Sequence, residues 1–133
     1  MEKRDYLLRQ IEALGRILSR LRGLILDGDT SAADTEIREE MRNVGIELTM
    51  ANALDPATLQ MLLGAPMLDA RRAFTVGSLL HADALRARAD GDAAWAARSS
   101  ASALALLVGV RSQLDGDRAT LADQILAEIR EHR

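Results

Sequence analysis

Apolar residues recur along this chain at intervals of three and four, which is the spacing of one face of an α-helix. The clearest case lies in residues 2–27, where an apolar seam alternates between these two intervals and makes the chain's longest run of heptad spacing. The seam consists of Leu7, Ile11, Leu14, Leu18, Leu21 and Ile25. A second apolar line beside it makes the buried face wider than a strict coiled-coil stripe. We therefore expect a long N-terminal helix that packs within its own domain, against a twin subunit, or both.

The same helical period continues along the rest of the chain, where turn residues divide it into further helices. Residues 31–54 carry one continuous stripe, and Asp55-Pro56 then signals a new start, since proline is favoured at the first helical position. A short helix follows, and a Gly-Ala-Pro turn places the main loop at residues 64–68. Further helices are expected over residues 69–89, 92–113 and 118–130. Since none of the apolar stripes alternates with a period of two, no β-strand is predicted.

The tripeptide Asp-Gly-Asp separates helical stretches at residues 27–29, 90–92 and 115–117. Glycine tolerates the left-handed backbone that ends a helix, and an aspartate after it can accept hydrogen bonds from the free N–H groups of the next helix. Turns this short place consecutive helices side by side and antiparallel. The expected fold is an all-α antiparallel helical bundle. It forms one domain over residues 1–133, a length that can bury a core without a metal or a disulfide.

Composition narrows the chemistry that the bundle can carry. Aromatic residues make up only 2% of the chain, so leucine, isoleucine, methionine and alanine must build the core. The absence of cysteine excludes disulfides, thiolate nucleophiles and cysteine zinc sites. A net charge of −3, with no aromatic residues interleaved among the arginines, speaks against nucleic-acid binding. The start of the chain has no apolar leader and no uncharged run approaches membrane-spanning length, so we expect a cytoplasmic protein.

Few residues offer catalytic or metal-binding chemistry. The first Asp-Gly-Asp cannot open an EF-hand loop, because Ala32 and Arg38 stand where that loop requires glycine and glutamate. His81 is the only histidine away from the chain end, and no Glu-x-x-His pair accompanies it, so no helical metal site is predicted. The mid-helix serines around Ser100 lack a nucleophile elbow and are expected to relieve crowding between helices. We predict no enzymatic activity, no metal and no cofactor.

Residues 79–106 resemble one helical hairpin of the tetratricopeptide repeat family. The matching positions are Leu80, Ala84, Gly91, Asp92, Ala96, Ala103 and Leu104. In that family the small residues at these places let two helices pack closely, so the resemblance implies a repeat-like hairpin across residues 69–113. Asp83 stands where leucine is usual and Ser100 where an aromatic residue is usual. A single copy is visible, whereas a repeat array normally needs about three or more.

A second resemblance concerns the start of the chain. The opening run Asp5-Tyr6-Leu7-Leu8-Arg9-Gln10-Ile11, followed by a leucine-rich helix and the later hairpin, resembles a family of small bacterial helical proteins of unknown function. This resemblance would span most of the chain. It implies a helical fold and no particular activity.

One face of the predicted hairpin could bind a partner. If the hairpin packs as the resemblance implies, Ser78, His81, Leu85 and Arg88 lie on the exposed concave side of its first helix, at spacings of 3, 4 and 3. This face combines an imidazole, an apolar contact and a guanidinium that can hold a carboxylate with two hydrogen bonds. An acidic or C-terminal peptide segment is the expected ligand. The alternative is that Leu85 belongs to the core while the histidine and the arginine flank it.

Three functional hypotheses follow from the sequence. The first is a non-enzymatic helical scaffold or protein-interaction protein, which forms a homodimer through the seam of its first helix and binds a protein or peptide partner. The second is a small-ligand binder or enzyme with a pocket between helices near His81. The third, ranked last because the apolar residues of the first helix lie on a packing seam, is a peripheral membrane protein that docks through that helix.

Overall fold

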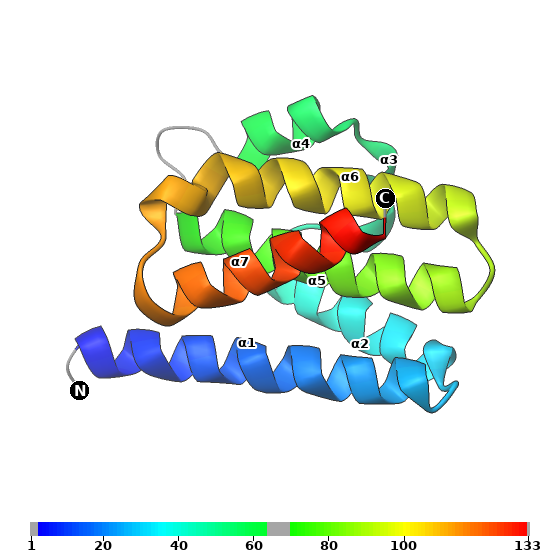
Figure 1. The fold of residues 1–133 in the computed structure, drawn as a ribbon, viewed down its shortest axis with the longest axis horizontal. Coiled ribbons are helices and arrows are strands. Elements are labelled where there is room, and N and C mark those ends of the chain that lie inside the picture. Colours follow the sequence, from blue (N-terminus) through cyan, green and yellow to red (C-terminus); the bar gives the residue numbers. More distant parts are fainter. Residues whose placement is uncertain (1–2, 64–69, 133) are drawn as a thin grey trace.

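A computed structural model describes the backbone of residues 3–63 and 70–132, and the side chains of residues 13–63 and 70–132. Within these ranges the chain is all-helical, as predicted, and the helices pack as a bundle (Figure 1). The elements are α1 (Lys3–Leu26), α2 (Thr30–Asn43), α3 (Leu48–Ala53), α4 (Pro56–Leu63), α5 (Ala70–Ala89), α6 (Ala93–Val110), the 3₁₀ turn η1 (Arg111–Gln113) and α7 (Gly116–Glu131). The predicted main loop at residues 64–68 lies outside the described residues.

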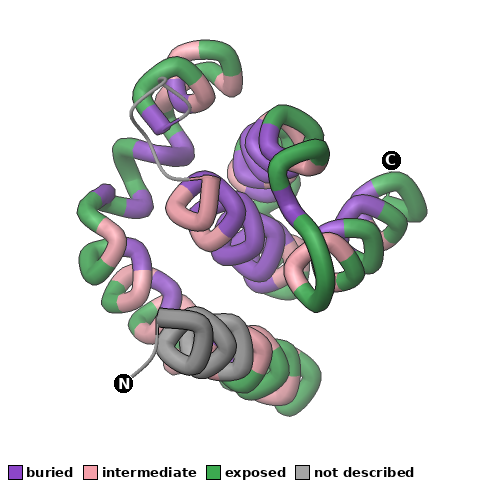
Figure 2. Tube along the Cα trace, turned by 90° about the vertical axis from the view of Figure 1, so that its left-hand side faces the viewer, coloured by how far each residue is buried: buried purple, intermediate pink, exposed green. Residues whose placement is uncertain are grey.

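Helices α5 and α6 form a central antiparallel hairpin that the other helices surround. Helices α1 and α2 pack on α5, α3 and α4 pack on α6, and α7 contacts both members of the hairpin (Figure 1). Most residues of α5 are therefore buried, while the outer helices bury only their inward faces (Figure 2). The position of α5 explains its sequence, because a helix covered on several sides needs apolar residues around most of its circumference.

The hairpin closes tightly because small residues stand where its two helices meet. A side chain at Gly77 would come within 3.1 Å of Leu107 on the facing helix, so the glycine allows this approach. On α6, Ala96 and Ala103 are buried, which agrees with the positions expected to be small. Large side chains of α5 such as Phe74 and Leu80 are also buried and belong to the core. The hairpin thus provides the rigid centre on which the remaining helices are placed.

Two of the three Asp-Gly-Asp turns have the predicted geometry. Gly28 and Gly91 adopt left-handed backbone angles, with φ of 81° and 80°. The aspartates that follow cap the next helices: Asp29 accepts a hydrogen bond from the N–H of Ala32, and Asp92 accepts one from Trp95. In the third turn, α7 already begins at the glycine, so the last aspartate lies in its first turn and does not precede the helix. Asp55, which precedes Pro56, caps α4 as expected.

The prediction of one continuous helix over residues 31–54 is wrong. The chain leaves α2 after Asn43 and re-enters a helix at Leu48. Gly45 lies between them with φ of 91°, a left-handed conformation that ends a helix. The N–H of Ile46 bonds back to the carbonyl of Met41, as in other glycine-terminated helix ends. The apolar spacing continued through the break because α2 and α3 both bury their stripes against the same central hairpin.

Candidate functional site

A cavity of about 230 Å³ lies between α1, α5 and α7. Its wall is mostly apolar, and hydrophobic side chains come from all three helices. These side chains are Leu18, Ile25, Ala82, Leu85, Leu121 and Ile125. We call this space the α1/α5/α7 cavity.

The cavity exists because small residues face one another where α1 crosses α5. Gly15 and Ser19 stand one turn apart on α1, and Ser78 and Ala82 stand one turn apart on α5. A Cβ atom built at Gly15 meets no described atom within 4 Å, so the glycine leaves room that a larger side chain would occupy. Small side chains on facing helices normally bring the helices together. Here space remains between them, and it is bordered by the larger side chains Leu18, Ile25 and Leu85.

A chain of polar contacts runs along the wall from α1 through α7 to α5. Nη2 of Arg22 donates to both carboxylate oxygens of Glu128, over 2.8 and 2.7 Å. Oε2 of the same carboxylate lies 2.7 Å from Nε2 of His81. The histidine side chain is almost completely enclosed, with 4% of the residue exposed. These contacts fix the orientation of the imidazole and join three helices that are distant in sequence.

The electrostatics of this chain keep the imidazole neutral and the carboxylate ionised. Burial lowers the pKa of His81, and this outweighs the hydrogen bond and the charge of Glu128, which raise it. The positive charge of Arg22 lowers the pKa of the histidine further. Burial raises the pKa of Glu128, but hydrogen bonds from Arg22 and His81 lower it by more, so the net direction is downward. Near neutral pH the site therefore holds one carboxylate, one guanidinium and one uncharged imidazole.

One buried polar atom of His81 is unsatisfied. Nδ1 of His81 is buried and has no hydrogen-bond partner within the described part of the chain. Buried polar atoms in folded proteins are nearly always paired, because leaving one unpaired costs the free energy of its lost hydration. The imidazole of His81 is therefore only half satisfied by the protein groups around it.

The chain has no detectable relative that would assign the site. No protein-family model, curated protein or solved structure matches it. The resemblances to a tetratricopeptide hairpin and to a family of small bacterial helical proteins therefore stay predictions.

The structure brings together three of the four residues predicted to bind a partner. Ser78, His81 and Leu85 all border the α1/α5/α7 cavity, whereas Arg88 lies half-buried on the last turn of α5 and is not part of its wall. The expectation of an exposed concave face is wrong, because α1 and α7 cover this side of α5. Ser78 is fully buried and donates its hydroxyl hydrogen bond to the carbonyl of Phe74 on its own helix. Sequence reasoning grouped the right residues on one face but placed that face in solvent.

The residues that complete the site could not be found from the sequence. Arg22 and Glu128 are 106 positions apart, and only the fold brings them to the same histidine. A weak signal existed on α1, where Gly15, Ser19 and Arg22 follow each other at helical spacing beside the apolar seam. Nothing in the sequence showed which helix would lie opposite them.

The seam proposed as a dimer interface packs inside the chain over its described half. Leu14 and Leu21 belong to the core, at 8% and 0% exposure. Leu18 and Ile25 are partly buried and line the cavity. The side chains of Leu7 and Ile11 lie outside the described residues. The first helix therefore satisfies much of its apolar face within its own domain, and the homodimer stays a prediction.

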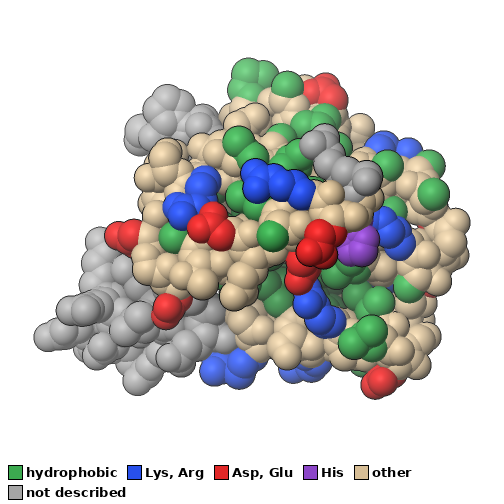
Figure 3. Space-filling view, viewed as in Figure 1, with side chains coloured by type: hydrophobic (Ala, Val, Ile, Leu, Met, Phe, Trp, Pro, Cys, Tyr) green, Lys and Arg blue, Asp and Glu red, His purple; other side chains and the backbone are tan. Residues whose placement is uncertain are grey.

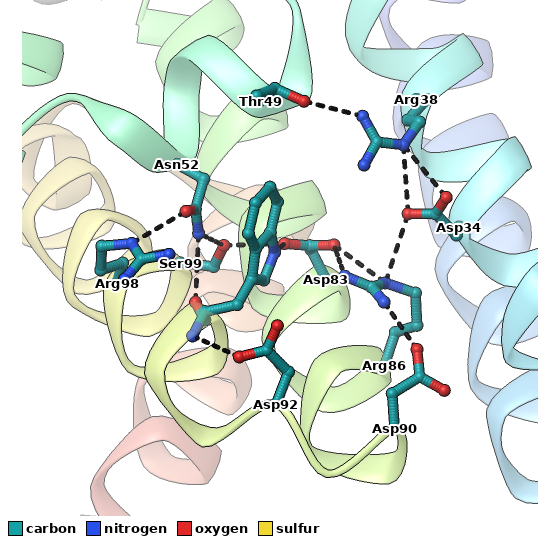
Figure 4. A network of polar contacts seen from close by, with 11 residues as sticks. Asp34, Arg38, Thr49, Asn52, Asp83, Arg86, Asp90, Asp92, Arg98 and Ser99 are labelled. Atoms are coloured by element: carbon teal, nitrogen blue, oxygen red, sulfur yellow. Dashed lines mark hydrogen bonds and ion pairs between the residues drawn. The ribbon is translucent and has the colours of Figure 1, made fainter.

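A second polar cluster lies on the opposite side of α5, and we call it the Asp83 network (Figure 4). The carboxylate of Asp83 is fully buried and accepts four hydrogen bonds. Arg86 donates two of them to Oδ1, and Trp95 Nε1 and the Ser99 hydroxyl donate one each to Oδ2, over 2.6 and 2.7 Å. Every lone-pair direction of this carboxylate is thereby used.

The Asp83 network continues to the outer helices. Arg86 also contacts Asp90 and Asp34, which ties α5 to α2. Asn52 on α3 donates to Ser99 and to the backbone carbonyl of Trp95, which ties α3 to α6 (Figure 4). Because its central carboxylate is fully paired with protein groups, the network serves to fix the packing of helices, and Asp83 offers no free acceptor to a ligand.

Neither cluster has the ligands of a metal centre. In the described ranges there is no group of three or more histidine, aspartate or glutamate side chains that could hold an ion. The polar side chains along the wall of the α1/α5/α7 cavity are those of Ser19, Arg22, Ser78, His81, Gln124 and Glu128.

Proposed function

We propose that this protein binds a small, mainly apolar molecule in the α1/α5/α7 cavity and does not convert it chemically. The observation that carries this proposal is the α1/α5/α7 cavity itself, whose mostly apolar wall includes a small number of polar side chains. Ligand sites are typically concave and apolar, with a few fixed polar groups that set orientation. The cavity has that composition.

The size of the cavity supports a ligand of about one ring. An apolar cavity of roughly 150 Å³ inside a protein can hold benzene. The 230 Å³ measured here is enough for one six-membered ring with a substituent. Left empty, such a space would deprive the side chains around it of dispersion contacts.

Binding without turnover is favoured because the cavity wall lacks an activated nucleophile. Ser78 directs its hydroxyl to the backbone carbonyl of Phe74, not to the imidazole. Glu128 is held between Arg22 and His81, where it orients the ring. The site therefore resembles a binding pocket more closely than an acid–base pair poised for reaction.

A substitution that fills the cavity tests the proposal. Gly15→Leu places a side chain in open space at the cavity wall, so it should abolish the binding of toluene, a neutral probe of one ring. Backbone amide chemical shifts in a toluene titration are the measurement. The wild type should show saturable shifts in α1, α5 and α7.

Gly23→Leu is the matched control. Gly23 lies on the same helix with the same open space around it, but it is not part of the cavity wall. This variant gains the same helix propensity. It should bind toluene like the wild type. A wild type without saturable shifts, or shifts that persist in Gly15→Leu, would contradict the proposal.

The interaction hypothesis has less support from the geometry. The face proposed for peptide binding is covered, and the described part of the dimer seam is internal. A protein partner and a homodimer therefore stay predictions, together with the cytoplasmic location.

The hypothesis of a peripheral membrane protein also has little support. One described segment, Ala93–Gln113, is long and apolar enough to cross a bilayer, but it contains the core helix α6, and core helices of soluble proteins pass the same test. The face drawn in Figure 3, on which α7 lies, mixes apolar, acidic and basic side chains. Docking on a membrane surface requires an apolar band flanked by basic residues.

A further inference from the structure

Helix α5 forms the floor of the α1/α5/α7 cavity, whereas α1 and α7 form its rims. On α5 the wall residues Ser78, His81 and Ala82 are buried. On the other two helices the wall residues Ser19 and Gln124 are exposed. Both α1 and α7 pack on α5, but they have few close backbone contacts with each other. The cavity therefore opens to solvent between α1 and α7.

An uncharged polar side chain stands on each rim of this opening. The hydroxyl of Ser19 on α1 and the amide of Gln124 on α7 have no hydrogen-bond partner among the described residues. A hydroxyl and a carboxamide can each donate and accept hydrogen bonds. Because both side chains are exposed and line the cavity, a molecule that enters can bond to them without breaking a hydrogen bond within the protein.

The charged side chains at the opening are paired with each other. Arg22 on α1 donates to both carboxylate oxygens of Glu128 on α7. They are the one basic and the one acidic residue in the described wall, apart from the neutral imidazole of His81. A ligand carboxylate or ammonium would meet one attractive and one repulsive charge side by side, so neither gains a strong net attraction. The opening therefore favours a neutral polar group.

We propose that the ligand is amphipathic, with a ring-sized apolar part in the cavity and a neutral hydroxyl or carboxamide group at the opening, where Ser19 and Gln124 bond to it. This inference rests on the proposed function, since it names the class of ligand for the same cavity. The polar end stays within reach of water, so the ligand buries no polar atom without a partner. Ser19 and Gln124 then select the polar group, while the apolar wall holds the ring.

Phenylacetamide, phenylacetate and toluene share one ring and differ in the polar group, so they are the probes for the test. The wild type should bind phenylacetamide more tightly than phenylacetate. Ser19→Ala and Gln124→Leu should each weaken the binding of phenylacetamide by about two- to tenfold, as expected for the loss of one hydrogen bond. Toluene has no polar group, so its affinity should not fall in either variant. Backbone amide chemical-shift titrations give the affinities.

Ser112→Ala and Gln113→Leu are the matched controls. They make the same substitutions at exposed positions of η1, outside the cavity wall. Both variants should bind all three probes like the wild type. Since the two rim residues are exposed as well, none of the four substitutions should unfold the protein.

The outcomes separate this inference from the proposed function. An unchanged affinity for phenylacetamide in either rim variant, or an equal loss of affinity for toluene, would overturn the assignment of Ser19 and Gln124. Binding of phenylacetate at least as tight as that of phenylacetamide would overturn the neutral polar group. Both results leave a cavity that binds apolar molecules. If none of the three probes binds the wild type, the proposed function fails as well.

Discussion

At the scale of single residues, α5 carries two buried polar side chains that differ in how they are satisfied. Asp83 faces α6 and has four hydrogen bonds from protein groups. His81 faces α7 and has one bond, which leaves a ring nitrogen unpaired. The first pattern is that of a structural network, whereas the second leaves one buried nitrogen without a partner among the described residues.

Asp83→Asn should destabilise the fold by about 3–5 kcal/mol, the usual effect of breaking a buried ion pair. The amide would place an N–H group against donors, either those of Arg86 or the indole of Trp95. Urea unfolding measures the change. The control is Asp90→Asn, which removes a partly exposed partner of Arg86 and should cost under about 1 kcal/mol. An Asp83→Asn protein with the wild-type unfolding midpoint would show that the network contributes little.

The stability of the protein should fall as the pH drops below 6.5, the ordinary pKa of histidine. The folded pKa of His81 is lower than this value, so the unfolded chain binds the proton first and protonation favours unfolding. A further loss is expected at lower pH, because the folded pKa of Glu128 also lies below its ordinary value. The measurement is the free energy of unfolding between pH 5 and pH 8, a range of roughly 1.5 units on each side of the ordinary histidine pKa.

His81→Gln is the control for this pH dependence. It removes the titrating group, so its stability should change less than that of the wild type between pH 5 and pH 7, roughly the window in which an unperturbed histidine titrates. Parallel profiles for the two proteins would assign the effect to other groups.

At the scale of elements, the α5/α6 hairpin depends on small residues at its contact. Ala96 and Ala103 are buried on α6, while Ala97 and Ala101 are exposed on the same helix. This difference allows a comparison within one element, in which the substitution is the same and only the environment changes.

Ala103→Leu and Ala96→Leu should each lower stability by about 1–3 kcal/mol, because the added carbons have no space between the packed helices. Ala97→Leu and Ala101→Leu should be nearly neutral, since their side chains extend into solvent. Thermal unfolding of the four variants is the measurement. If the buried and exposed substitutions have the same effect, the close approach of the two helices does not depend on these alanines.

At the scale of the whole molecule, α1 is both part of the core and one wall of the cavity. It packs on α5 and α2, and the described part of its seam is buried in the chain itself. The heptad spacing that suggested a twofold interface is therefore used, in this region, to cover the central hairpin.

Leu21→Asp should unfold the protein and not merely dissociate a dimer, because it buries an unpaired charge in the core. Circular dichroism and light scattering on the variant and the wild type test this. A variant that stays folded would mean that Leu21 can be exposed without cost. Separately, a wild-type mass of 14.5 kDa at micromolar concentration would contradict the predicted homodimer.

The sequence by itself determined the helices and most of their ends. Their apolar period, the left-handed glycines at Gly28 and Gly91 and the capping aspartates are local features, which act through the backbone within a few residues. The break at Gly45 was also encoded locally. It was concealed because the apolar stripes of α2 and α3 continue the same spacing across it. The sequence likewise placed Ser78, His81 and Leu85 on one face of one helix.

Only the tertiary structure decided what covers that face. The cavity, the Arg22–Glu128–His81 contacts and the burial of the α1 seam each join segments that are far apart along the chain. Local spacing fixes which residues share a side of a helix, because the helical period is a property of the backbone. It does not fix which other helix packs there. That choice depends on how all the helices bury their apolar surface together, and here it turned a predicted exposed face into one wall of a cavity between three helices.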